Sequence, residues 1–104
     1  PSHYRKIKQA FPDYMDAVEN LGETAANSGP LDKKTAHLLQ LAASVANKSE
    51  GSVHSHTRQL LELGAEPQEI QHAILLLTST IGFPTVMAGM SWANDIIEAR
   101  YAAG

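Results

Sequence analysis

The sequence contains no cysteine in its 104 residues. This absence excludes disulfide bonds, thiolate metal ligands and every reaction that needs a nucleophilic or redox-active thiol. Aromatic residues are also scarce, with one Trp, three Tyr and two Phe. A hydrophobic core must therefore be built mainly from Leu, Ile, Val and Ala, and the chain is long enough for one such core.

A strong charge of either sign is lacking as well. The formal net charge is −3, and the eight basic residues are scattered apart from short pairs. Because a nucleic-acid-binding protein would carry a basic face and a membrane-surface protein a basic cluster, we expect neither partner. The longest apolar run, Ala73–Leu77, is far too short to cross a bilayer, and no signal-peptide pattern is visible. We therefore expect a cytoplasmic protein.

Apolar residues recur at helical spacing, and strand-like alternation is absent from the sequence. Pro12 interrupts the first helical pattern, Asp32 is a good N-cap, and Gly64 is typical of a helix end. The breaker cluster at residues 27–30 is too short to separate domains. We predict one all-α domain over residues 1–104, with about five or six helices. These helices are expected over residues 2–26 in two pieces, 32–48, 49–64, 67–81 and 84–101.

One of these helices, residues 67–81, is apolar on more than one side. Ile70 and Ile74 share one face, whereas Leu75 and Leu76 lie on another. A helix that is apolar nearly all round is usually buried on all sides, and a chain of this length offers few places to bury it. The pattern therefore favours an oligomer.

Residues 49–64 combine a polar first turn with a leucine-rich second half. On a helix, Ser49, Ser52 and His56 share a face, because residues three and four apart are neighbours. Val53 and Leu60 flank the same stripe, so we expect it to point inward. Hydroxyl and imidazole groups in such a place are the types that carry nucleophilic or acid–base chemistry.

Three segments, in their order and spacing, carry a family resemblance. They are Gly-Pro-Leu-Asp-Lys-Lys-Thr at 29–35, His-Thr at 56–57 followed by Gly-Ala-Glu-Pro-Gln-Glu-Ile at 64–70, and Ile-Gly-Phe-Pro at 81–84. From about Phe11 to Ile97 the chain resembles the carboxymuconolactone decarboxylase family, which includes the alkylhydroperoxidase D-like proteins. The resemblance implies an alkylhydroperoxidase D-like helical bundle that assembles into homotrimers, or into homohexamers made of dimers.

Thiol-active members of that family carry a Cys-x-x-Cys pair, a histidine four residues after the second Cys, and a glutamate on the preceding helix. In this chain the cysteine positions fall on Ser49 and Ser52, the histidine on His56 and the glutamate on His37. The histidine between the cysteines of the peroxidase subgroup is Gly51 here. Because a serine hydroxyl is not ionised near neutral pH and cannot cycle through sulfenic acid, thiol peroxidase activity is not expected.

His56 is the first candidate for catalysis, with His37, Ser52 and Ser49 as the other candidate site residues. An imidazole acts as a general acid or base near neutral pH. The decarboxylase branch of the family also lacks the cysteine pair, and the resemblance implies delivery of a proton to carbon after loss of carbon dioxide. The alternatives are structural: His56 as a satisfied histidine at a helix interface, Ser52 as a lining residue, and Ser49 as an N-cap.

No metal or cofactor site is predicted. His37, His56 and His72 would have to meet to bind Zn²⁺, and no local pairing such as His-x-x-x-His supports this. His54 points to a different face from His56, so we expect it to face solvent or a neighbouring subunit. A glycine-rich phosphate loop and a dinucleotide fingerprint are both absent from the sequence.

Two functions from different classes follow. The first is a carboxymuconolactone decarboxylase-like lyase acting on a small carboxylated lactone or related acid, with His56 transferring the proton. Arg58 or Lys48 would then hold a substrate carboxylate, unless both are simply solvated cations. The second is a catalytically silent oligomeric binding or scaffold protein, so the sequence leaves enzymatic activity open. The expected partners are further copies of the chain and, for the lyase, a small carboxylate.

Overall fold

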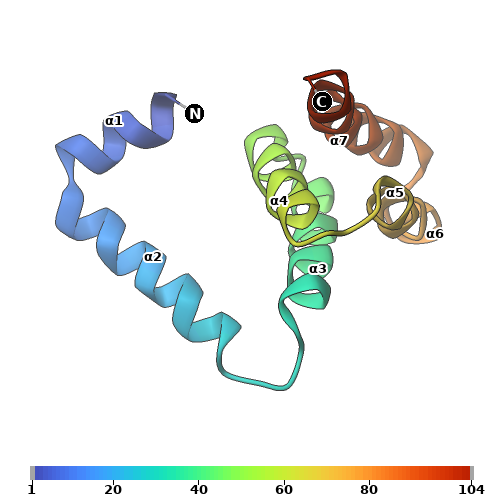
Figure 1. Ribbon diagram of the computed structural model, residues 1–104. Coiled ribbons are helices and arrows are strands. Elements are labelled where there is room, and N and C mark those ends of the chain that lie inside the picture. The colour runs from blue at the N-terminus through green and yellow to red at the C-terminus, as the bar shows by residue number, and fades with distance from the viewer. Residues whose placement is uncertain (1, 104) are drawn as a thin grey trace. The chain divides into compact units, whose positions relative to one another are not determined.

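The computed structural model of the protein describes residues 2–103, among which it contains α-helices and no strand (Figure 1). The predicted all-α class is confirmed. The helices are α1 (Ser2–Ala10), α2 (Pro12–Ala26), α3 (Lys33–Ala46), α4 (Glu50–Glu62), α5 (Pro67–Leu75), α6 (Thr78–Ile81) and α7 (Phe83–Ala103).

The helix predicted over residues 67–81 is divided into two, and α6 is a single turn of 4 residues. The hydroxyl of Thr78 donates a hydrogen bond of 2.8 Å to the carbonyl oxygen of Leu75. The N–H of Leu77 bonds to the carbonyl of Ile74, three residues back, at 3.1 Å. A threonine side chain and a tightened turn thus replace the regular helical ladder at this point.

The chain divides into two compact units, residues 1–31 and 32–104, which we describe separately. The first unit contains α1 and α2, joined by an exposed ion pair of 3.1 Å between Lys8 and Glu19. Met15 is its buried apolar residue, with 8% exposure. Other large apolar residues before and along α2 are exposed, namely Phe11, Tyr14, Val18 and Leu21. Whether residues 1–104 form one domain stays a prediction.

The second unit holds the hydrophobic core, built by α3, α4, α5 and α7. In this unit the structure buries Val53 and Leu60 of α4 and Ile70 and Ile74 of α5, which recur at helical spacing in the sequence. Thr57 of α4 is also fully buried, and its hydroxyl donates to the carbonyl of Val53 at 2.7 Å. Core residues without any exposure are Leu41, Val45, Val53, Leu60, Ile70, Ile74, Val86 and Ala93.

Helices α3 and α7 approach closely at Gly89. A Cβ atom built on Gly89 would lie 2.6 Å from Cγ1 and 2.8 Å from Cγ2 of Val45. The side chain of Val45 is β-branched and fully buried, so it has no room to move away. Glycine at position 89 is therefore a requirement of this helix contact.

Side-chain contacts stabilise the starts of α3 and α5. Asp32 caps α3, since its carboxylate accepts a hydrogen bond of 2.8 Å from the N–H of Thr35. The carboxylate of Glu69 accepts from the N–H of Glu66 at 2.9 Å at the start of α5. It also pairs with Lys34 at 2.8 Å, which joins α5 to α3.

The turn between α3 and α4 begins after Ala46, two residues earlier than predicted. Lys48 adopts a φ of 55° there, an uncommon value for a residue other than glycine. The N–H of Ser49 then bonds back to the carbonyl of Ser44 at 3.0 Å. This tight connection fixes how α4 is placed against α3.

Several large apolar side chains of the second unit face solvent in the single chain. Leu75 and Leu76, at the end of α5, are 48% and 64% exposed, and Phe83 at the start of α7 is 62% exposed. The second apolar face predicted for residues 67–81 is thus present and uncovered. Among the described helices, none has both the length and the hydropathy needed to cross a membrane.

Candidate functional site

Two histidines from consecutive helices form the centre of the candidate site. His37 projects from α3 and His56 from α4, and their Nδ1 atoms lie 3.1 Å apart. The ring centroids are 5.3 Å apart, with 50° between the ring planes. Both side chains are partly buried. The structure therefore brings together two of the four residues that the sequence singled out.

At this distance one Nδ1 must carry a proton and the other must accept it. Burial lowers the pKa of His37 below its ordinary value of 6.5, and the positive charge of Lys33 lowers it further. The pKa of His56 is lowered by burial as well, and additionally by the charge of His37. Two imidazolium rings would oppose N–H to N–H, so the pair holds one added proton at most near neutral pH.

Ser52 faces a different partner. Its hydroxyl oxygen lies 2.7 Å from that of Ser44, and the hydroxyl of Ser44 donates to the carbonyl of Gln40 at 2.7 Å. Because a serine hydroxyl has one proton to donate, Ser52 must be the donor to Ser44. The proton of Ser52 is therefore engaged in tying α4 to α3, which matches the reading of Ser52 as a lining residue.

Ser49 occupies the N-cap position of α4, as the sequence suggested, although its side chain does not cap the helix. Its backbone makes the contacts instead: its carbonyl accepts from the N–H of Val53 at 3.0 Å. Catalytic roles for Ser49 and Ser52 stay predictions. Their described contacts are structural.

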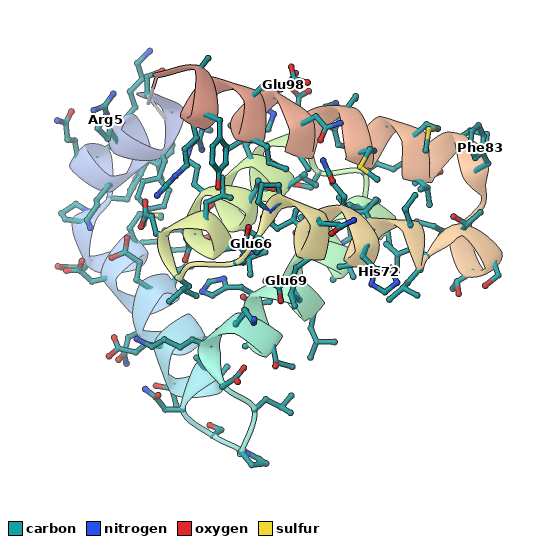
Figure 2. The ribbon with its side chains drawn as sticks, turned by 45° about the vertical axis from the view of Figure 1, so that its right-hand side comes forward. Arg5, Glu66, Glu69, His72, Phe83 and Glu98 are labelled. Atoms are coloured by element: carbon teal, nitrogen blue, oxygen red, sulfur yellow. The ribbon has the colours of Figure 1, made fainter. Side chains whose placement is uncertain are left out.

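His72 does not form a group of possible metal ligands with His37 and His56. Among the described residues, the group whose side chains could share a metal ion is Glu50, His54 and Asp95, not the three histidines considered from the sequence. His72 is exposed on α5, which also carries Glu69, and Glu66 lies just before this helix at its N-cap position (Figure 2). These three line a surface depression of about 540 Å³, together with Gln68, Gln71 and Leu75.

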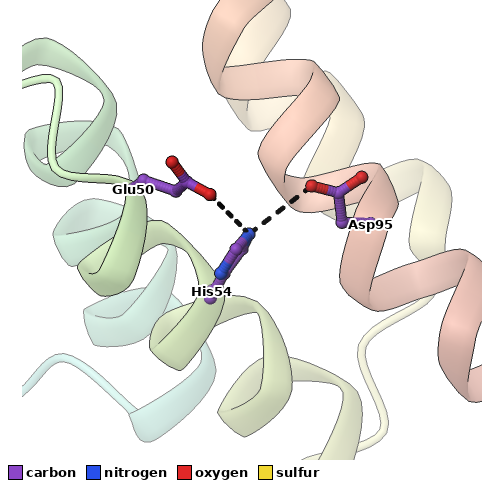
Figure 3. Close-up of side chains that lie close together, drawn as sticks. All are labelled: Glu50, His54 and Asp95. Carbon is purple, nitrogen blue, oxygen red and sulfur yellow. Dashed lines mark ion pairs between the residues drawn. The ribbon is translucent and has the colours of Figure 1, made fainter. Parts of the chain in front are cut away.

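His54 is the residue that sequence reasoning placed wrongly. It was expected to face solvent or a neighbouring subunit, but its side chain is only 21% exposed and its Nε2 atom is buried. It lies between Glu50, one turn earlier on α4, and Asp95 of α7 (Figure 3). The spacing of Glu50 and His54 at i and i+4 already indicates that these two side chains are neighbours on the helix. The sequence gives no sign of Asp95.

A cation that was not expected lies near the site. Arg58 and Lys48, considered as carboxylate-binding groups, have exposed side chains. Lys33, which sequence reasoning did not single out, acts electrostatically on His37. It lies in the first turn of α3, one turn before that histidine. The structure thus offers a different ammonium group beside the pair.

These features define an all-helical protein whose candidate polar site lies between two consecutive helices. Residues 12–95 match the sequence model of the carboxymuconolactone decarboxylase family. Because this match covers most of the chain, the protein belongs to that family, as the resemblance implied.

Its relatives include two proteins of Methanocaldococcus jannaschii, both described as uncharacterized. One is 31% identical over 78 residues, which cover 75% of this chain and 73% of the relative. The other is 25% identical over 85 residues, which cover 81% and 82%. Similarity to these proteins assigns no activity.

The fold is shared with a solved structure. The apo crystal structure of a carboxymuconolactone decarboxylase family protein from Legionella pneumophila matches with a TM-score of 0.81 at 26% identity. The match covers 93% of this chain and 87% of that one. The fold that the family resemblance implied is thereby confirmed.

Proposed function

We propose that the protein is a lyase that removes carbon dioxide from a small carboxylated lactone or related acid. The proposal rests on family membership and on the contact of 3.1 Å between His37 and His56. A decarboxylation needs a proton source at the carbon that loses the carboxylate, and a partly buried imidazole pair is suited to this task.

The pair supplies the proton without leaving an uncompensated charge. It starts singly protonated, with His37 as the imidazolium and its Nδ1–H donated to Nδ1 of His56. The bond between carbon and carboxylate breaks, carbon dioxide leaves, and the electron pair on carbon takes the proton from Nε2 of His56. The Nδ1 proton of His37 moves to His56 at the same time. Both rings end neutral, and the pair takes up a new proton from water.

The substrate carboxylate needs a positive group close to the pair. Lys33 meets this requirement, since its charge already acts on His37 and its side chain is exposed. An ammonium group binds a carboxylate as a point charge, without the two-pronged geometry of arginine. We assign Lys33 to hold the carboxylate that is retained in the product or lost in the reaction.

The test is a decarboxylation assay on a panel of small carboxylated lactones. His56→Ala should lower kcat by about 10²- to 10⁴-fold, the usual contribution of a positioned acid or base. His72→Ala is the matched control, because this histidine is exposed on α5 and outside the pair. Equal rates for the wild type and His56→Ala would remove His56 from the mechanism.

A second candidate function is a catalytically silent binding or scaffold protein. It is favoured by the contact of 2.7 Å that engages the hydroxyl of Ser52 with that of Ser44. This candidate predicts that no member of the panel is turned over, and that a bound acid, detected by calorimetry, is recovered unchanged.

Both candidates include self-association into a homotrimer or homohexamer in the cytoplasm. The supporting observation is the exposed apolar surface, with Leu76 at 64% and Phe83 at 62% exposure in the single chain. Burying such side chains between copies would be favourable by roughly 1.5–3 kcal/mol for each one fully covered. Light scattering should therefore give a multiple of the 11.2 kDa chain mass, and a monomer would contradict this part.

A further inference from the structure

His54 points its Nε2 atom into a gap between two carboxylates. Nε2 lies 3.9 Å from an Oε of Glu50, which precedes it by one turn of α4, and 3.7 Å from an Oδ of Asp95 on α7 (Figure 3). The ligand atoms of all three side chains lie within 4.8 Å of one another. Residues distant in sequence thus converge at the contact of two packed helices.

The Nε2 atom is buried, and it has no hydrogen-bond partner among the described residues. Both carboxylate distances are too long for a hydrogen bond, which spans about 2.7–3.2 Å for nitrogen and oxygen. A buried polar atom without a partner is unfavourable by about 1–3 kcal/mol, and a bound water or ion is one explanation for such an atom. A ligand that accepts the lone pair of Nε2 would remove this cost, and the exposed carboxylates of Glu50 and Asp95 lie beside it.

We propose that Glu50, His54 and Asp95 bind a divalent transition-metal ion, and that this ion is Zn²⁺. Zinc binds imidazole nitrogen and carboxylate oxygen at about 2.0–2.2 Å, which puts tetrahedral ligand atoms about 3.4 Å apart. The observed separations of 3.7 and 3.9 Å are close to this value. The two carboxylates are 59% and 63% exposed, so their side chains have room to move closer to Nε2 and to each other, from separations within 4.8 Å among the three ligand atoms.

The ligand set also matches the charge of the ion. Two carboxylates carry a charge of −2, and a neutral imidazole with its proton on Nδ1 presents a lone pair on Nε2. Three protein ligands leave one tetrahedral position for water or a further ligand. An imidazole favours zinc over calcium and magnesium, which are harder ions and prefer ligand sets made of oxygen alone.

This site is independent of the proposed catalytic pair. His54 and His56 are two residues apart on α4, so their side chains leave the helix about 160° apart. His54 reaches toward α7, whereas His56 reaches toward α3. Metal binding at the first does not require the second, and the inference stands whether or not the protein is a decarboxylase.

The test is calorimetric titration of the full chain with Zn²⁺ at neutral pH. We expect one saturable site per chain, with affinity lowered more than about 100-fold in His54→Gln and in Asp95→Asn, beyond the usual effect of losing an outer-shell partner. His56→Gln and His72→Gln are matched controls and should bind as the wild type does. Circular dichroism verifies that each variant keeps its helices.

A second measurement locates the ion directly. Nitrogen-detected NMR of the histidine rings should show zinc-induced displacement of the Nε2 resonance of His54, with the other histidines unmoved. The proposal is overturned if the wild type shows no saturable binding, or if His54→Gln and Asp95→Asn bind as tightly as it does. Loss of binding in His56→Gln instead would place the ion at the histidine pair and equally overturn it.

Discussion

The Nδ1 atoms of His37 and His56 lie 3.1 Å apart, so the two rings share one hydrogen bond across the contact of α3 and α4. When both rings are neutral, the ring that donates through Nδ1 has a free lone pair on Nε2, and the other ring carries its proton on Nε2. The direction of one hydrogen bond thus sets which histidine is the base and which is the acid. The family resemblance places the glutamate of thiol-active members at position 37, where this chain carries a histidine that contacts a second imidazole.

The first prediction concerns the pH dependence of the proposed reaction. Because the pKa values of both histidines are lowered, the singly protonated pair should accumulate only as the pH falls below about 6.5. The decarboxylation rate should therefore rise as the pH is lowered through this range. In His37→Gln the ring that carries the added proton in the proposed step is lost, so both the rate and this rise at low pH should decrease. Rates that do not change between about pH 5 and pH 7.5 would refute the shared proton.

The second prediction concerns stability. The folded protein binds fewer protons at His37 and His56 than the unfolded chain does, because burial lowers both pKa values below 6.5. Unfolding is therefore favoured as the pH falls below about 6.5, until the folded histidines also become protonated. Urea titrations between about pH 5 and pH 7 should show this loss. Carboxylates of lowered pKa, such as those of Asp32 and Glu69, stay ionised there.

The control for the stability prediction is the variant that replaces both histidines with glutamine. It should lose much of the dependence on pH in this range, whereas His72→Gln should keep it. An equal slope in the wild type and the double variant would show that the pair does not titrate as described.

The third prediction concerns the contact of Ser52 with Ser44. Ser52→Ala removes the donor to Ser44, so we expect destabilisation by about 0.5–1.5 kcal/mol with little effect on the proposed activity. A double-mutant cycle with Ser44→Ala should give a coupling energy of similar size. Additive effects would show that the contact of 2.7 Å contributes nothing. If Ser52→Ala lost as much activity as His56→Ala, Ser52 would have to be counted as a catalytic residue.

The fourth prediction concerns the approach of α7 to α3. In Gly89→Ala the new methyl group would overlap Val45, so we expect destabilisation by about 1–3 kcal/mol in urea unfolding. Gly51→Ala is the matched control, since a Cβ there meets nothing within 4 Å. Better helix propensity should make it neutral or stabilising by up to about 1 kcal/mol. Equal effects of the two substitutions would contradict the close packing.

Local features of the sequence were sufficient for most of the fold. The N-cap at Asp32 and the break at Pro12 depend on residues close in sequence, and the structure has both. The buried stripes were found because helical spacing repeats along each element. The exposure of Phe11 and Leu21 was not predicted, because periodicity identifies an apolar face without saying what covers it.

The site was harder to predict for the same reason. Family resemblance placed His37 and His56 in one site, yet nothing local shows that their Nδ1 atoms meet. Ser52 and His56 are one turn apart and looked like partners, but Ser44 on the neighbouring helix binds the hydroxyl instead. The position of Asp95 beside His54 depends on how α7 packs against α4, which no motif within either helix expresses.

Helix α4 has two separate polar edges. Its fully buried residues Val53, Thr57 and Leu60 form a stripe that lies between the edge of Ser52 and His56 and the edge of Glu50 and His54. Because the two edges share no described contact, substitutions on one and on the other should change the free energy of unfolding additively. A lineage could therefore replace the chemistry of one edge while keeping that of the other, which makes this helix a place where a new activity can arise without loss of an old one.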